Sequence, residues 1–286
     1  MKHEPESRWS LLLMAAALAV IGALYFRGLQ QPINGLHELT LPSVPTPVAA
    51  PLDEQSSPTP DTPVIHPIDQ ALAGHGLPAA TTAERAESPE QAATTTLEQS
   101  FEAGLAAMVG SATFAELFVS DDLINRIVVS VDNLSHEKLP VRLWPVRPVG
   151  GLPLVSSGLG PLTLGPDNSA RYSTYVRLLE RLDLKQLAAL YVRDYDRFQQ
   201  AYAALGYPNG YFNDRLVDVI DHLLVTPEIS SPLLVVQPKV MYQFADQGLE
   251  SRSIGQKILL RMGPANAGIV KLRLRELRRL VTRGAP

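Results

Sequence analysis

Residues 183–206 read DLKQLAALYVRDYDRFQQAYAALG and carry the clearest structural signal in the chain. Large apolar residues recur here at steps of three and four, the spacing of one face of an α-helix. Asp183 and Gln186 form a capping-box pattern, and Gly206 can end the helix. The stretch therefore predicts one continuous helix of about six turns. Its buried stripe consists of Leu184, Leu187, Tyr191, Tyr195, Phe198, Tyr202 and Leu205.

The flanking sequence predicts further helices, separated by proline and glycine. They are expected at 97–108, 111–118, 121–134, 168–182, 211–225, 247–262 and 264–282, with Ser120 as an N-cap and Pro264 at a first helical position. The arm 139–166 is rich in proline and glycine, so we expect it to be extended, with a short hairpin around 156–158 and Trp144 anchoring it. The fold class predicted for 97–286 is thus mainly α: a compact, bundle-like domain of about seven or eight helices with little sheet.

An uncharged run of residues, 9–26, precedes this domain and is closed at both ends by arginine. At 1.5 Å per residue it would reach roughly 27 Å, close to the thickness of the hydrocarbon core of a bilayer. Aromatic residues lie at both ends, where a membrane interface favours them. We therefore predict one transmembrane helix, with interface residues Arg8, Trp9, Tyr25, Phe26 and Arg27.

The orientation of this helix follows from the positions of lysine and arginine. Lys2 and Arg8 precede the span, whereas Arg27 alone follows it closely, which predicts that 1–8 are cytoplasmic. In a bacterium the chain would then be a single-pass inner-membrane protein with a periplasmic C-terminal domain. Two alternatives remain open: a signal peptide cleaved after Ala17 or Ala19, and a buried core helix.

Residues 28–96 contain many prolines and no Phe, Trp or Tyr. Such a Pro/Ala/Thr-rich stretch cannot bury enough apolar area to offset chain entropy, so we predict a disordered linker that tethers the domain. The domain itself has 21 Lys and Arg against 19 Asp and Glu. This near-neutral balance argues against a nucleic-acid partner, whose phosphates require a basic surface.

The usual catalytic motifs are absent from the sequence, and it predicts no catalytic residue, cofactor or definite metal ligand. One candidate face lies on the helix predicted at 211–225, where Asp214, Asp218, Asp221 and His222 share a sector. This face could hold a divalent cation, supply an acid–base pair, or bind a partner or arginines. The alternative that we favour is an ordinary solvated polar face.

Two further patterns have both a structural and a functional interpretation. Seven tyrosines between 172 and 211 could form a ligand groove, although their helical spacing favours core packing. The last predicted helix is basic and amphipathic, so it could lie on anionic lipid or bind an acidic partner. Pairing of its arginines with carboxylates of the same domain is the interpretation that we favour.

Several stretches resemble the family known as domain of unknown function 3014. They are Gly206-Tyr207-Pro208-Asn209-Gly210-Tyr211-Phe212-Asn213-Asp214-Arg215, Ile220-Asp221-His222-Leu223-Leu224, Tyr242-Gln243-Phe244-Ala245-Asp246, Gly255-Gln256-Lys257 and Leu260-Arg261-Met262-Gly263-Pro264. The resemblance covers roughly 100–283. It implies a bacterial, envelope-associated protein with one membrane anchor and a proline-rich spacer, and it implies no activity.

These observations favour a non-catalytic interaction or scaffold module of the cell envelope. Its partners would be membrane lipid, through the N-terminal helix, and an envelope protein or cell-wall component. The first alternative is a metal-dependent hydrolase that uses Asp218, Asp221 and His222. The second is a membrane-surface sensor that acts through the basic C-terminal helix.

Overall fold

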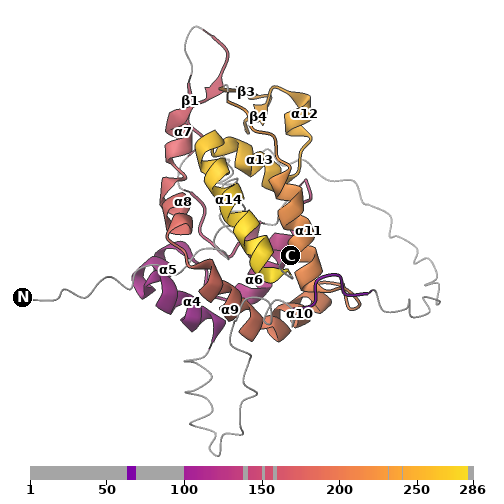
Figure 1. Ribbon diagram of the computed structural model, residues 1–286. Coiled ribbons are helices and arrows are strands. Elements are labelled where there is room, and N and C mark those ends of the chain that lie inside the picture. The colour runs from indigo at the N-terminus through magenta and orange to yellow at the C-terminus, as the bar shows by residue number, and fades with distance from the viewer. Residues whose placement is uncertain are drawn as a thin grey trace, which may run out of the picture.

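The computed structural model describes residues 63–68, 100–137, 141–149, 152–156, 160–230, 232–239 and 241–282. These residues form a mainly helical domain with a small sheet at one end (Figure 1). The predicted transmembrane helix 9–26 and its interface residues lie outside the described ranges, as does most of the linker 28–96. Within those ranges, no helix is both long and apolar enough to cross a bilayer.

The elements follow one another as a helical first half, a strand-containing arm, and a second helical half. The helices are α4 (Phe101–Val109), α5 (Ser111–Leu117), α6 (Leu123–Asn133), α7 (Pro166–Ala170), α8 (Ser173–Glu180), α9 (Leu184–Arg193), α10 (Tyr195–Ala204), α11 (Phe212–Leu224), α12 (Gln247–Glu250), α13 (Ile254–Arg261) and α14 (Pro264–Val281). The strands are β1 (Val155–Ser156), β2 (Thr163–Leu164), β3 (Leu233–Val236) and β4 (Gln243–Phe244).

The predicted number of helices is wrong, although their locations are largely right. The described residues contain eleven α-helices, because each of three predicted helices is divided in two. The stretch 168–182 becomes α7 and α8, 184–205 becomes α9 and α10, and 247–262 becomes α12 and α13. Apolar spacing alone did not reveal the break between α9 and α10, because the stripe continues across it.

The break between α9 and α10 lies at Asp194. Its backbone leaves the helical region, with φ −100° and ψ 13°, and its carboxylate accepts hydrogen bonds from Arg193 at 2.7 and 2.9 Å. The two halves of the apolar stripe then serve different partners: α9 packs against α4 and α14, whereas α10 packs against α6. Tyr191 and Phe198, one from each half, still meet edge to face at 5.1 Å. The break thus lets one stripe contact helices that lie in different directions.

The helix boundaries test the predicted caps. Asp183 caps α9 as expected, accepting hydrogen bonds from the backbone N–H groups of Lys185 and Gln186. Pro264 is the first residue of α14, also as expected. The start predicted for α6 is wrong, because its N-cap is Asp122 in a left-handed conformation (φ 54°) rather than Ser120. Local hydrogen bonding of the short Asp side chain makes this conformation accessible to it.

In the parts of the arm that the structure describes, 141–149, 152–156 and 160–165, the chain is free of α-helix as predicted and contains one 3₁₀ turn, Val141–Leu143. Trp144 anchors it, with only 2% of its surface exposed. The expected hairpin is present as an antiparallel pair of β1 and β2, in which Val155 lies opposite Leu164. β3 and β4 extend this pair to a sheet in the order β1-β2-β3-β4.

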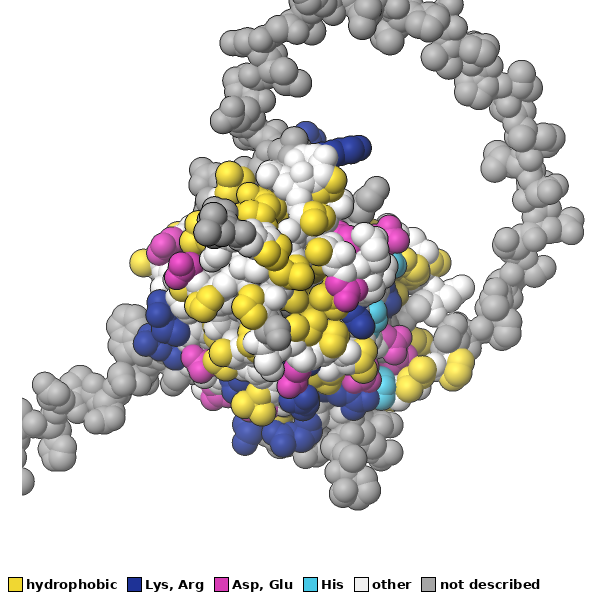
Figure 2. All heavy atoms as spheres, turned by 90° about the horizontal axis from the view of Figure 1, so that it is seen from above, with side chains coloured by type: hydrophobic (Ala, Val, Ile, Leu, Met, Phe, Trp, Pro, Cys, Tyr) yellow, Lys and Arg dark blue, Asp and Glu magenta, His cyan; other side chains and the backbone are white. Residues whose placement is uncertain are grey.

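The sheet has one face toward the helices and one toward solvent. Its inner face forms a small second core, which contains Leu164, Val235, Phe244 and Leu260. Its outer side carries exposed aliphatic residues, and Figure 2 shows hydrophobic side chains gathered over this end of the molecule. The exposed residues are Leu152, Leu154, Leu234 and Val236.

The main core lies between α11, α14 and the helices around them. α13 approaches α6 closely at Gly255, where an added Cβ would lie 2.6 Å from Leu223 Cδ2 and 2.8 Å from the carbonyl oxygen of Leu134. The N–H of Gly255 uses this proximity to donate to that carbonyl at 3.0 Å. α11 packs against α14 and α6, and its first turn carries the candidate site.

Candidate functional site

The four residues of the predicted acidic face all lie on α11, but they have different surroundings. Asp221 accepts hydrogen bonds from the Nε and Nη2 groups of Arg278 on α14, at 2.6 and 2.8 Å. His222 Nε2 lies 2.8 Å from Ser253 Oγ, and Asp218 is exposed. In the ranges that the structure describes, no group of three or more His, Cys, Asp or Glu side chains could hold a metal ion.

The imidazole of His222 is held in its neutral form. Burial lowers its pKa, and the positive charges of Arg215 and Arg252 lower it further. A neutral ring can either donate to or accept from the Ser253 hydroxyl, which lies at the start of α13. This contact joins two helices of the domain.

Asp214, the fourth residue, contacts the N-terminal part of the chain. Its Oδ2 accepts the main-chain N–H of Ile65 at 3.0 Å, and its Oδ1 accepts that of His66 at 2.6 Å. The neighbouring Asn213 donates from Nδ2 to the carbonyl oxygen of His66 at 2.8 Å. We call Asn213 and Asp214 together the main-chain clamp. In Figure 1 the segment that they hold is the indigo trace beside α10 and α11.

The clamp binds a short part of the stretch 28–96, which the sequence predicts to be a disordered linker. Residues 63–68 are the part of that linker that the structure describes, and they lie against the domain. Ile68 also packs against the main core. The physical reason is that a segment outside helices and strands has unpaired main-chain N–H groups, whose hydrogen bonds a carboxylate at the start of a helix can accept. The only sequence signal for this docking was a weak one, three aliphatic residues at 64, 65 and 68.

Asn213 is fixed in place by the helices around it. The residue is fully buried, and its Nδ2 also donates to the carbonyl oxygen of Val281 at the end of α14, at 2.9 Å. Its Oδ1 accepts the hydroxyl of Tyr191 at 3.3 Å, and its N–H donates to the hydroxyl of Tyr195 at 3.4 Å. Val281 accepts one hydrogen of the amide and Tyr191 donates to its oxygen, so these two contacts within the domain leave the second hydrogen directed toward His66.

The two tyrosines that support Asn213 remain protonated at physiological pH. Burial raises the pKa of Tyr191 well above its ordinary value, and Tyr195 and Asp214 raise it further. Burial also raises the pKa of Tyr195 to about 12. Both phenols therefore keep the proton that a hydrogen-bond donor needs.

Arg215, the residue after the clamp, ties α11 to α6. Its Nε donates to Asp132 Oδ1 at 2.8 Å, and its Nη2 donates to Ser135 Oγ at 2.8 Å. The hydroxyl of Tyr207 lies 3.4 Å from the other oxygen of Asp132. Three successive residues, 213 to 215, thus bind three different parts of the chain.

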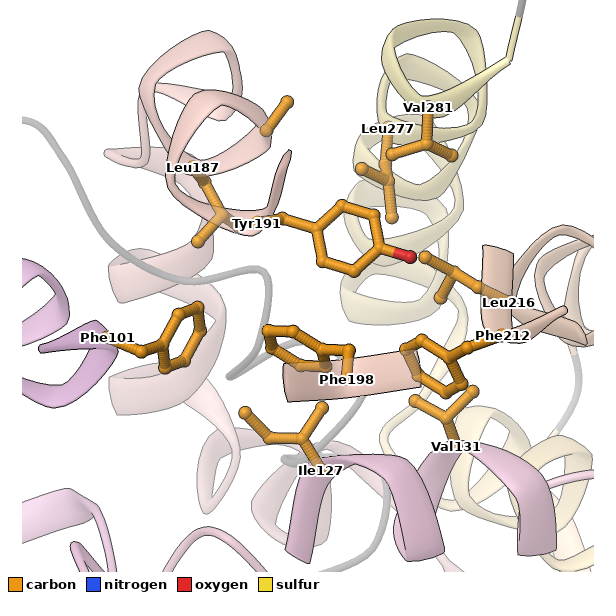
Figure 3. Close-up of a pocket in the computed structure, with 11 residues that line it drawn as sticks. Phe101, Ile127, Val131, Leu187, Tyr191, Phe198, Phe212, Leu216, Leu277 and Val281 are labelled. Carbon is orange, nitrogen blue, oxygen red and sulfur yellow. The ribbon is translucent and has the colours of Figure 1, made fainter. Parts of the chain in front are cut away.

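The core beside Tyr191 contains a small cavity of about 40 Å³. Figure 3 shows the aromatic rings of Phe101, Phe198 and Phe212 around it, and the Tyr191 hydroxyl directed to the side of Leu216. The lining is almost wholly apolar, so it offers a water molecule too few hydrogen-bonding partners. We interpret this space as a packing void.

A larger cavity, of about 330 Å³, lies between the sheet and the helices α7, α13 and α14. Leu164, Leu233, Leu260 and Pro264 are among its lining residues. The sequence did not reveal it, because its walls include strands whose pairing was not predicted beyond the first hairpin. Its lining is mainly apolar, and it carries no cluster of groups that defines a reaction.

The burial of the tyrosines supports core packing, the interpretation that the sequence favoured, over the alternative of a ligand groove. Tyr172, Tyr175, Tyr191 and Tyr202 are buried. Tyr207, by contrast, is 41% exposed and stacks on Tyr202, with ring centroids 4.7 Å apart. The tyrosines therefore fill the core and its rim.

The basic residues of α14 also have mainly structural surroundings. Lys271 is buried, and its Nζ donates to the carbonyl oxygen of Thr226 at 2.6 Å. Arg273 pairs with Glu276 at 2.6 Å, and Arg278 pairs with Asp221. The apolar side of the helix is buried in the main core through Leu274, Leu277 and Leu280. That side is therefore not available to a membrane surface.

The docked segment is held with a small net free energy. Two hydrogen bonds to a carboxylate contribute roughly 1.5–3 kcal/mol each, and the neutral one contributes about 0.5–1.5 kcal/mol. Partial burial of Ile68 adds about 1 kcal/mol. Ordering six residues costs roughly 6–12 kcal/mol, and Pro63 and Pro67 bring this toward the lower end. Gain and cost are of similar size, so the net free energy that holds the segment is small and a competing segment can overcome it.

Comparison with curated proteins and with solved structures gives no match for the chain. The family described as Protein of unknown function (DUF3014) matches residues 123–278. The match begins at α6, ends within α14 and includes both residues of the clamp. It covers more than half of the 286 residues. The chain therefore belongs to the DUF3014 family.

Proposed function

We propose that this protein is a non-catalytic interaction module of the bacterial cell envelope. In this proposal, residues 9–26 anchor the chain once in the inner membrane with 1–8 in the cytoplasm, and the helical domain lies in the periplasm. The observation that carries the interaction role is the main-chain clamp. Its two side chains bind a polypeptide through two N–H groups and one carbonyl group.

The surroundings of α11 favour this role over the first alternative, a metal-dependent hydrolase. That enzyme would use Asp218, Asp221 and His222, but Asp221 is occupied by Arg278 and His222 contacts Ser253. A carboxylate in a bidentate pair with arginine is a poor ligand, because binding a cation would require the pair to separate. The neutral charge balance of the domain also argues against a nucleic-acid partner.

The second alternative, a membrane-surface sensor, has lost its main support. It requires the apolar side of α14 to lie in the lipid interface, whereas this side is packed in the core. The partners that remain are membrane lipid through the N-terminal helix and an envelope protein or cell-wall component on the domain.

Crosslinking of the full-length protein in its native membrane, followed by affinity purification and mass spectrometry, tests the proposal. We expect a reproducible partner that persists when residues 28–62 are deleted and is lost when 97–286 are deleted. Divalent-metal titration of the same protein provides the contrast. The absence of any partner, together with a metal-dependent rise in melting temperature that Asp218→Ala abolishes, would favour the hydrolase.

A further inference from the structure

We infer that the main-chain clamp is a binding site for short peptide segments that bend at the bound residues, a site that residues 63–68 occupy in cis and a segment of a partner protein occupies in trans. The inference rests on the proposed interaction role and names the chemistry of its ligand. The clamp is a different site from the exposed outer side of the sheet, for which the structure shows no occupant.

The contacts define what the ligand must offer. Asp214 requires two successive main-chain N–H groups, here those of Ile65 and His66, and Asn213 requires the carbonyl group of the second residue. The side chain of Ile65 is 68% exposed, so this position does not select the ligand by its side chain. A segment of almost any sequence can therefore present the groups that the clamp reads.

Selectivity comes from the two following positions. Pro67 keeps the preceding residue out of the α-helical region, which helps to hold the His66 carbonyl group in place. Ile68 follows and packs against the main core. The preferred ligand is thus a short segment that bends at the two N–H donors and continues with a proline and an aliphatic residue. A proline at this position lowers the conformational entropy that the segment loses on binding, because its φ angle is already fixed.

The two sides of the contact differ in rigidity, which is the arrangement expected of a receptor and its ligand. Asn213 is fully buried, with α14 and α9 holding its amide in place. None of residues 63–68 is buried. The clamp is therefore pre-organised, whereas the segment lies on the surface, where another segment can replace it.

The covalent connection explains why the segment in cis occupies the site by default. A ligand on the same chain is present at an effective concentration in the millimolar range, so a weak contact is sufficient to fill the site. A partner segment must bind more tightly or be locally concentrated. Its binding would release residues 63–68 and so lengthen the chain between the domain and the N-terminal helix.

Competition in the full-length protein tests the inference. The variant Ile65→Pro/His66→Pro removes both N–H donors from the cis segment without changing the domain. The probe is a fluorescent peptide with the sequence of residues 62–69, TPVIHPID, and its binding is measured by fluorescence anisotropy. We expect at least tenfold tighter binding to the variant than to the wild-type protein, because the clamp of the variant is empty.

Two further substitutions in the emptied variant identify the site. Asp214→Asn should weaken peptide binding at least tenfold, whereas Asp218→Asn, which removes an exposed charge one turn further along α11, should leave it unchanged. Thermal melting of each variant establishes that the domain remains folded. A folded emptied variant that does not bind the peptide, or equal binding with and without Asp214→Asn, would overturn the inference.

The failure of this inference can be distinguished from that of the proposed function. If Asp214→Asn retains the crosslinked partner while the peptide does not bind, the partner uses another surface and only the clamp inference is lost. If neither a peptide nor a crosslinked partner binds, both are refuted.

Discussion

Arg215→Ala should destabilise the domain more than any surface substitution. In the folded protein Arg215 donates to the carboxylate of Asp132, which is only 5% exposed. Removing the guanidinium leaves this carboxylate with the Tyr207 hydroxyl as its remaining donor, at a long distance of 3.4 Å. The cost arises because a buried charge then lacks both its counter-ion and its shortest hydrogen bond.

The magnitude follows from the burial of the two partners. Breaking a buried ion pair by removing one partner costs about 3–5 kcal/mol. The side chain of Arg215 is 22% exposed, so water can reach part of the site and we expect the lower end of this range. For a domain of this size, about 3 kcal/mol corresponds to a melting temperature lower by roughly 6–12 °C.

Thermal unfolding of the full-length protein, followed by circular dichroism, measures this shift. The matched control is Arg275→Ala, which removes an exposed arginine of α14 and should change stability by less than about 0.5 kcal/mol. The variant Asp132→Asn/Arg215→Met should melt above Arg215→Ala, because it leaves no buried charge. A melting temperature for Arg215→Ala within error of the control would refute the reasoning.

Three further predictions concern the clamp and the titrating groups. Hydrogen exchange followed by mass spectrometry should show slowed exchange in 63–68 of the wild-type protein. Asp214→Asn should accelerate this exchange, whereas Asp218→Asn should not. Exchange of the wild type at the rate of an unstructured peptide would contradict the docking. Because the pKa of His222 is lowered in the folded state, the unfolded state binds more protons in this pH range. The contribution of His222 to the free energy of unfolding is therefore fully present above pH 6.5 and is lost as pH falls through the folded pKa. Denaturant titrations should therefore show a steeper acid loss for the wild type than for His222→Gln, and equal slopes would contradict this. Burial raises the pKa of Tyr195 from 10.0 to about 12. The contribution of Tyr195 to the free energy of unfolding is therefore present below pH 10 and is lost as pH rises toward 12. Tyr195→Phe should flatten the alkaline part of the stability profile, and an unchanged profile would count against burial of the phenol.

Much of the helical architecture could be predicted because its signals are local. The capping residue Asp183, the helix start at Pro264 and the antiparallel pairing near Val155 follow from neighbouring residues along the chain. The burial of Trp144 was also predicted. An arm without helices needs a large apolar side chain to anchor it to the core, and Trp144 is such a residue. These features depend on backbone preferences and apolar spacing, which the sequence expresses directly.

The breaks within helices could not be predicted in the same way. Asp194 interrupts an apolar stripe that is regular on both sides, and the interruption depends on where α4, α6 and α14 lie. The partners of the acidic face were hidden for a related reason. Helical spacing places Asp214 and Asp221 on one sector, but only the packing of other segments decides that one binds a main chain and the other binds Arg278.

By itself, the amino-acid sequence determined a mainly helical domain, most helix ends and an extended arm, because periodicity, caps and prolines act over a few residues. The tertiary structure alone decided that Asn213 and Asp214 face residues 63–68. The clamp binds main-chain N–H and C=O groups, which nearly every residue possesses. The side-chain sequence of its ligand therefore gives almost no signal of the contact. Such recognition becomes visible only when two segments separated by about 150 positions lie next to each other, as Ile65 and Asp214 do.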